Sequence, residues 1–146
     1  MTDWSSSITG ATLRPVPGQT ITKMVEAAEA MDADEVLVYL NGTESNGLEQ
    51  AAIADASAAA TSKGVLGLRL AGSLASSDGS CDAGEVITIA ILGPVTGFTG
   101  LDETKEYFVS NTAGYGADAV GTVTRSIGWP LKSTAFNFTP ANTPSS

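Results

Sequence analysis

Residues 84–101, GEVITIAILGPVTGFTGL, constrain the fold more than any other stretch of the chain. Residues 86–92 form an uncharged run with three isoleucines, which is typical of one fully buried strand. Proline removes a backbone donor and fixes one backbone angle, so we predict that Gly93-Pro94 ends this strand. Gly97 and Gly100 follow closely and predict a tight corner. The other strands are expected to pack around residues 86–92.

Runs of β-forming residues lie on both sides of this strand. VLVYL at 36–40 predicts a short strand that ends at the turn signal Asn41-Gly42, and GVLGLRL at 64–70 predicts another with Gly67 in its interior. Three further strands are predicted within residues 107–110, 120–129 and 134–138. The pattern indicates a mainly β fold, either a small β-barrel or a sandwich.

Two segments, residues 20–34 and 48–63, fit either a helix or a strand. In the first segment the alanine and glutamate content favours a helix, yet ITKMV equally fits the start of a strand. In the second, the alanine count favours a helix, but serine, aspartate and threonine leave little apolar face for packing. We therefore expect at most one or two short helices, and both segments stay open.

Two parts of the chain resemble each other in the order of their elements. VLVYL, a turn, a small-residue segment and VLGLRL are followed later by YFVS, a turn, a small-residue segment and SIGWPL. Gly67 and Gly128 hold matching places in the two series. A duplicated strand-turn-strand unit predicts a small barrel or sandwich whose edges are closed or are covered by a neighbouring subunit.

The length of 146 residues fits one domain with flanking segments. We place this β-rich domain at residues 20–140, and its small side chains predict a thin core that a partner subunit completes. Residues 1–19 carry spaced apolar side chains and two prolines without a helix or strand period. They predict an extended N-terminal arm that is either disordered or ordered against a partner. Residues 141–146 are expected to be a flexible tail.

The charge of the chain argues against two classes of partner. Seven Lys and Arg residues against 16 Asp and Glu residues give a formal net charge of −9. Such a charge repels nucleic-acid phosphates and anionic membranes, so we expect neither as a partner. The sequence has no apolar run long enough for a membrane span and no signal peptide, which predicts a soluble protein made in the cytosol. Its single cysteine, Cys81, can form no internal disulfide.

The residues that most often carry out catalysis are missing from this chain. It has no histidine, the most frequent general base and metal ligand, and Cys81 therefore has no histidine to activate it. No phosphate-binding glycine motif joins a strand to a helix. Two acidic groups lack the spacing of a calcium-binding loop: Asp32, Asp34 and Glu35, and Asp78, Asp82 and Glu85. We expect no enzyme, no cofactor and no metal.

Five motifs after residue 96 form an ordered series. They are GFTGL at 97–101, YFVS at 107–110, Gly114, IGWPLKST at 127–134 and FTP at 138–140. In this order they resemble the C-terminal part of tailed-bacteriophage head decoration (capsid cement) proteins and related virion fibre proteins. VLVYLNG and GVLGLRLAGS are similar to the preceding half of these proteins, so the resemblance covers residues 20–140. Two places depart from the pattern of these proteins. Residues 102–105 replace a Pro-Gly pair, and Pro130 replaces an alanine.

The resemblance implies a tulip-like β-barrel or sandwich, commonly trimeric, that binds the outer surface of a bacteriophage capsid. Such a protein stabilises the shell by bridging major capsid proteins, and it is made in the host cytoplasm before it joins the virion. The arm is then expected to contact the capsid through Trp4, Ile8, Leu13, Arg14 and Val16. Contacts between subunits of a homotrimer are expected at Gly67, Gly128 and Trp129.

Two other functions stay open. A head or tail fibre component could bind a host-surface glycan by stacking sugars on Trp129, Phe136 or Phe138. Aromatic residues at alternate strand positions are more often core residues, so their burial would argue against this role. A small enzyme would need two close, desolvated carboxylates, and the sequence contains no recognisable pair of this kind.

Overall fold

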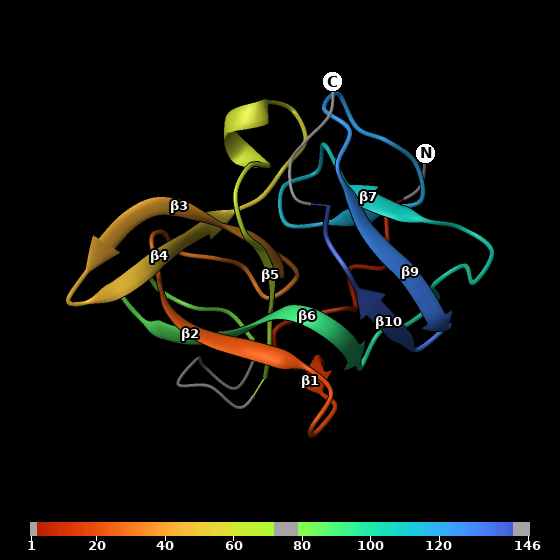
Figure 1. Ribbon diagram of the computed structural model, residues 1–146, viewed down its shortest axis with the longest axis horizontal. Helices are drawn as coiled ribbons and strands as arrows, with labels where there is room; N and C mark the ends of the chain where they lie inside the picture. The colour runs from red at the N-terminus through yellow and green to blue at the C-terminus, as the bar shows by residue number, and fades with distance from the viewer. Residues whose placement is uncertain (1–2, 72–78, 142–146) are drawn as a thin grey trace.

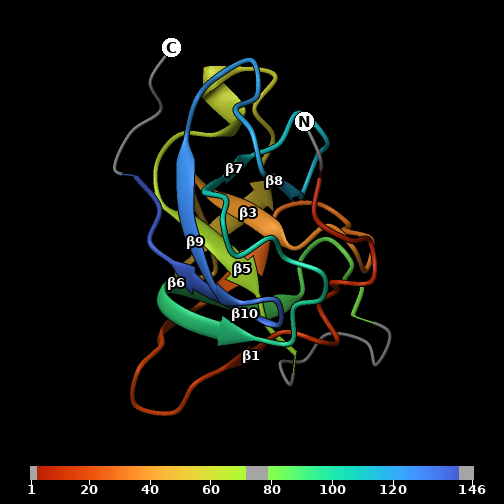
Figure 2. The same cartoon turned by 90° about the vertical axis from the view of Figure 1, so that its right-hand side faces the viewer.

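The computed structural model describes residues 3–71 and 79–141, which form a mainly β protein (Figures 1 and 2). This confirms the predicted fold class. The strands are β1 (Arg14–Pro15), β2 (Ile21–Ala27), β3 (Leu37–Ser45), β4 (Leu48–Ile53), β5 (Leu66–Arg69), β6 (Val86–Thr96), β7 (Tyr107–Val109), β8 (Gly116–Ala117), β9 (Ser126–Lys132) and β10 (Ala135–Phe138). The helical part of the described residues is a single 3-10 turn, η1 (Ala59–Thr61). Within these ranges, no helix has the length and apolar character needed to cross a membrane.

Strand β6 belongs to two sheets and connects the two halves of the molecule. Its first part pairs with β2 and β5, and the pairings β2–β4, β4–β3 and β3–β5 close a five-stranded ring. Its last residues pair with β1 and β10 in a second sheet that continues through β9 and β7 to β8. Figure 1 shows the ring on the left and the second sheet on the right, with β6 passing between them. The residues that were expected to organise the fold therefore do so.

The predicted end of this strand at Leu92 is wrong, because β6 continues to Thr96. Gly93 adopts a φ of 107°, and a Cβ atom there would lie 2.6 Å from the carbonyl oxygen of Gln19. The glycine lets the backbone turn from one sheet into the other without ending the ladder. Pro94 lies opposite Asn137 of β10 beyond this bend.

Two apolar cores correspond to the two sheets. The ring encloses Val25, Ala27, Met31, Val38, Leu40, Ala51, Cys81, Ile87 and Ile89. A larger core lies between the ring and the second sheet and includes Trp4, Ile8, Leu13, Leu37, Leu66, Leu68, Val95, Phe98, Tyr107, Ile127, Phe136 and Phe138. Because successive side chains of a strand point to opposite faces, β6 supplies both cores, with Ile89 in the first and Ala90 in the second.

Both segments that fitted either a helix or a strand form strands. In residues 20–34 this is β2, which pairs with β6 along six residues and with β4 at Glu26 and Ala27, and so closes the ring. In residues 48–63 it is β4, followed by η1. These tertiary pairings override the helix propensity of alanine and glutamate. Differences in helix propensity amount to only about a few tenths of a kcal/mol per residue.

The two similar parts of the sequence form units with the same strand order. The first has the order β4-β3-β5-β6 and the second the order β8-β7-β9-β10, and the two units join where β6 pairs with β10. The matching glycines lie at similar places, since Gly67 pairs with Val38 of β3 and Gly128 pairs with Tyr107 of β7. That the units arose by duplication stays a prediction.

Residues 3–13 do not form an arm that stands apart from the domain. Trp4, Ile8 and Leu13 are buried in the larger core, and Asp3 forms a β-bridge with Ala117 of β8. The aromatic side chains of the second sheet need an apolar cover, which this segment supplies. At the other end, Ala141 contacts the domain, and residues 142–146 of the predicted tail lie outside the described residues.

Candidate functional site

Three of the five residues expected to contact a capsid face inward. The Trp4 ring lies edge-on to Phe98, with centroids 5.4 Å apart, and to Phe136, at 6.2 Å. Ile8 and Leu13 are fully buried. In this conformation none of the three side chains is accessible to another protein, which argues against the expected arm contacts through them.

Arg14 and Val16, the other two residues, remain accessible. Arg14 is exposed in β1, and its Nη1 donates to the carbonyl oxygen of Ala11 at 2.9 Å. Val16 is half-buried in the loop that joins β1 to β2. Pro15 lies between them and has no N–H, so this short edge cannot extend the sheet through that residue.

Gly67 and Gly128 lie inside the sheets and not at an edge. β5 runs between β3 and β6, and β9 runs between β10 and β7. A Cβ atom at Gly67 would lie 2.6 Å from Cδ1 of Ile89, and one at Gly128 would lie 2.1 Å from the carbonyl oxygen of Asn137. Both glycines therefore permit close packing within the chain. Trp129, the third residue expected between subunits, is about half exposed.

Gly128 provides a test of this close approach. Its φ of 134° is rarely adopted by other residues, so we expect Gly128→Ala to lower the free energy of unfolding by about 3 kcal/mol. The matched control is Gly100→Ala, since Gly100 also has a positive φ but has no neighbour within 4 Å of a Cβ atom. Urea denaturation measures both variants. Equal losses would contradict the role of the contact with β10.

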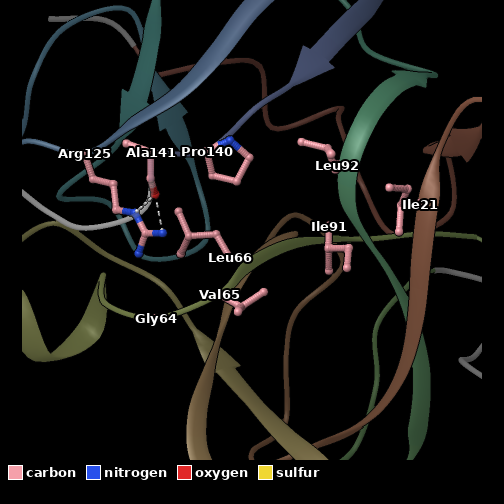
Figure 3. Close-up of a pocket in the computed structure, with 9 residues that line it drawn as sticks. All are labelled: Ile21, Gly64, Val65, Leu66, Ile91, Leu92, Arg125, Pro140 and Ala141. Carbon is pink, nitrogen blue, oxygen red and sulfur yellow. Dashed lines mark hydrogen bonds between the residues drawn. The ribbon is translucent and has the colours of Figure 1, made fainter.

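A hollow of the described surface lies where β6 leaves the ring. We call it the junction groove, and its volume is about 450 Å³. Its lining residues are Ile21, Gly64, Val65, Leu66, Ile91, Leu92, Arg125, Pro140 and Ala141. Figure 3 shows Arg125 at one end and Ile21 at the other, with the apolar side chains between them. A cleft of this size, mostly apolar and with few polar groups, has the character of a binding site.

The fold builds the groove from segments far apart in the sequence. Ile21 lies opposite Leu92 at an irregularity of the β2–β6 ladder, which leaves both side chains exposed. Val65 leads into β5, and Pro140 follows β10. The sequence prediction missed this site, because an apolar residue in a strand is normally assigned to the core and only the register shows which ones stay outside.

The second sheet carries two further apolar side chains, Pro94 and Trp129. Trp129 lies opposite Asn137, and Asn137 lies opposite Pro94, so these residues form one row across β9, β10 and β6. Pro94 is two residues beyond Leu92, where the groove begins. We refer to the groove residues Ile21, Val65 and Leu92 together with Pro94 and Trp129 as the apolar surface.

Among the described residues that line the groove, Arg125 is the only charged one, and it is 2% exposed. Its Nε and Nη2 donate to the carbonyl oxygen of Ala141 at 3.0 and 2.6 Å, and its Nη1 donates to that of Ser62 at 2.5 Å. Burial lowers the pKa of this guanidinium, although arginine remains charged at neutral pH. The groove thus has a positive charge at one end.

Two of the acidic residues considered for calcium accept backbone hydrogen bonds. Glu35 accepts a hydrogen bond from the backbone N–H of Asp32 at 2.7 Å, and Glu85 accepts one from Asp82 at 2.9 Å. Residues 3–71 and 79–141 contain no group of three or more potential metal ligands. Asp78 lies outside the described residues.

One acidic side chain meets a tyrosine near the start of β8. Tyr115 donates its hydroxyl hydrogen bond to Asp34. Burial and this carboxylate raise the pKa of Tyr115 to about 12. The hydroxyl is therefore protonated at neutral pH, and the contact fastens the β7–β8 turn to the loop before β3.

No family model matches this chain, and neither a curated protein nor a solved structure is significantly similar to it.

Proposed function

We propose that this protein is a structural virion component that binds the outside of a bacteriophage capsid and stabilises the shell by bridging major capsid proteins. The observation that carries the proposal is the apolar surface, on which Ile21, Val65, Leu92 and Trp129 are each about half exposed. Grouped exposed apolar residues around a groove are typical of protein contacts. The motifs between residues 97 and 140 that resemble decoration proteins support the same function.

The proposal also includes self-association, as a homotrimer on the virion. Repeated copies on a lattice need only modest affinity at each contact, because neighbouring contacts act together. With Gly67 and Gly128 inside the sheets, Trp129 and the exposed residues Arg14 and Leu131 are the better candidates for contacts between subunits.

The test is co-sedimentation of the purified protein with expanded capsids that lack it. We expect Ile21→Lys and Leu92→Lys each to weaken capsid binding by about tenfold or more, because a lysine charge would have to be desolvated in the contact. The matched control is Met24→Lys, since Met24 lies on the same strand, is 57% exposed where Ile21 is 51%, and does not line the groove. It should bind like the native chain.

Folding of each variant is checked by its thermal denaturation. The proposal is supported if the native chain and Met24→Lys saturate the capsids at a fixed ratio and the two groove variants do not. If the native chain does not bind capsids, the proposal is overturned. If all variants bind capsids equally, the apolar surface does not take part in the contact. Deletion of residues 1–17 would not separate capsid contact from folding, because it would also remove Trp4, Ile8 and Leu13 from the core.

Glycan binding has one specific observation in its favour, the exposure of Trp129 beside Asn137. An aromatic face next to an amide can stack on and hydrogen-bond to a sugar. Phe136 and Phe138, in contrast, are fully buried and belong to the core. Binding to a glycan array that is lost in Trp129→Ala would favour this function over capsid binding.

A further inference from the structure

Arg125 is a buried cation without an acidic partner in the part of the chain that the structure describes. Its three hydrogen bonds there all go to carbonyl oxygens, two to Ala141 and one to Ser62. The single ion pair among the described residues joins Lys23 to Glu49 at 2.6 Å, elsewhere on the surface. A charge held away from water is normally compensated by an opposite charge, and the described residues supply none to Arg125.

The other buried arginine shows what compensation looks like in the same protein. Arg69 also donates to three carbonyl oxygens, but acidic groups lie near it. Burial lowers the pKa of Arg69, and Cys81, Glu35 and Asp34 act in the opposite direction. Burial also lowers the pKa of Arg125, but there no acidic group among the described residues acts in the opposite direction. Arg69 is enclosed in the fold, whereas Arg125 lines the groove.

Two N–H groups of the Arg125 guanidinium have no hydrogen-bond partner among the described residues. The guanidinium carries five N–H groups, and the carbonyls of Ala141 and Ser62 use three of them. A carboxylate is the acceptor that best matches the remaining charge and the planar geometry. The rest of the groove, from Leu66 to Ile21, offers apolar side chains only (Figure 3).

We propose that the junction groove binds an apolar segment of the major capsid protein that carries a carboxylate, which pairs with Arg125. This inference rests on the proposed function and specifies which chemistry of the partner is recognised. The apolar side chains of the segment cover Val65 and Leu92, and its acidic side chain reaches the end of the groove at Arg125. Pairing within an apolar contact strengthens the charge interaction, because water is excluded.

The first test uses the native chain and three probes with the same eight-carbon tail: octanoate, octanol and octylammonium. Methyl NMR spectra follow the groove residues Ile21, Val65, Leu66, Ile91 and Leu92. We expect octanoate to shift these methyl signals and to bind about tenfold more tightly than octanol. Octylammonium should not bind, although the net charge of −9 attracts cations. Equal binding of all three probes would overturn the inference.

The Arg125→Lys variant tests the residue itself, with native-like folding checked by its spectrum. It keeps the charge and removes the fork of donors, so octanoate affinity should fall to that of octanol. The probe series on the native chain decides the question even where this variant does not fold.

The second test links the site to its partner. Octanoate, but not octylammonium, should release the native chain from expanded capsids in co-sedimentation. If octanoate binds the groove and capsid binding persists at saturating octanoate, the capsid segment is not the occupant and this inference is wrong, while the proposed function stands. If the native chain binds no capsid at all, the proposed function fails, and the inference fails with it.

Discussion

Replacement of Trp4 by alanine is expected to lower the free energy of unfolding by about 4 kcal/mol. The side chain is 4% exposed and contacts Phe98, Tyr107 and Phe136, so its removal leaves a cavity in the larger core. Urea denaturation followed by circular dichroism measures the change. A surface arm would behave differently, because truncating an exposed side chain changes stability by about 0.5 kcal/mol or less.

Two further variants identify the origin of this effect. The indole Nε1 of Trp4 has no hydrogen-bond partner among the described residues, so Trp4→Phe loses only contact area and should cost about 1 kcal/mol. A Cβ atom at Gly116 would lie 2.5 Å from the Trp4 ring. Gly116→Ala should therefore lower the free energy of unfolding more in the native chain than in the Trp4→Ala variant. In a double-mutant cycle we expect this difference to be about 1 kcal/mol. Additive effects would contradict the packing of this ring on β8.

The fold class and its central strand could be predicted from the sequence, because the signals are local. An uncharged run rich in isoleucine predicts burial, and Ile87, Ile89 and Ala90 are buried in the two cores, whereas Leu92 at the end of the run is 44% exposed. The order of the two similar units was also visible in the sequence. The predicted end of the first strand at Asn41-Gly42 is wrong, however, because β3 continues to Ser45 and the turn lies at Asn46-Gly47.

The errors arose where tertiary context decides the outcome. Gly93-Pro94 has the composition of a strand end, yet Gly93 bends β6 between two sheets that exist only in the folded chain. Residues 3–13 have no periodicity, yet Trp4 and Ile8 are buried because the second sheet leaves its aromatic residues uncovered. Neither outcome has a signal within the segment itself.

The candidate site was hidden for a related reason. Ile21, Val65 and Leu92 are apolar residues of the kind normally assigned to the core, yet all three are about half exposed. Ile21 and Leu92 lie opposite each other at an irregularity of the β2–β6 ladder. Arg125 lies in the strand predicted within residues 120–129, where a charged side chain is normally exposed. Only the structure shows that its guanidinium is enclosed by Ser62 and Ala141.

The largest effect of a single charged residue is expected at Arg69. Its Nε, Nη1 and Nη2 donate to the carbonyl oxygens of Glu35, Gly79 and Asp32 at 2.8, 2.6 and 2.7 Å. Arg69→Met removes all three donors from buried or half-buried acceptors, so we expect the free energy of unfolding to fall by about 4 kcal/mol. Arg69→Lys restores the charge but not the fork of donors, and about 2 kcal/mol should still be lost.

The dependence on salt distinguishes this buried arrangement from a surface charge effect. The loss in Arg69→Met should be the same in low salt and in about 1 M salt, because ions do not screen hydrogen bonds inside the protein. Lys23→Met is the matched control, since Lys23 pairs with Glu49 at the surface and should lose less than about 1 kcal/mol, most of it only at low salt. If Arg69→Met lowered the free energy of unfolding no more than Lys23→Met does, Arg69 would not fasten the loops at residues 32–35 and 79 to β5. The ring would then have to be held by its strand pairings and apolar core alone.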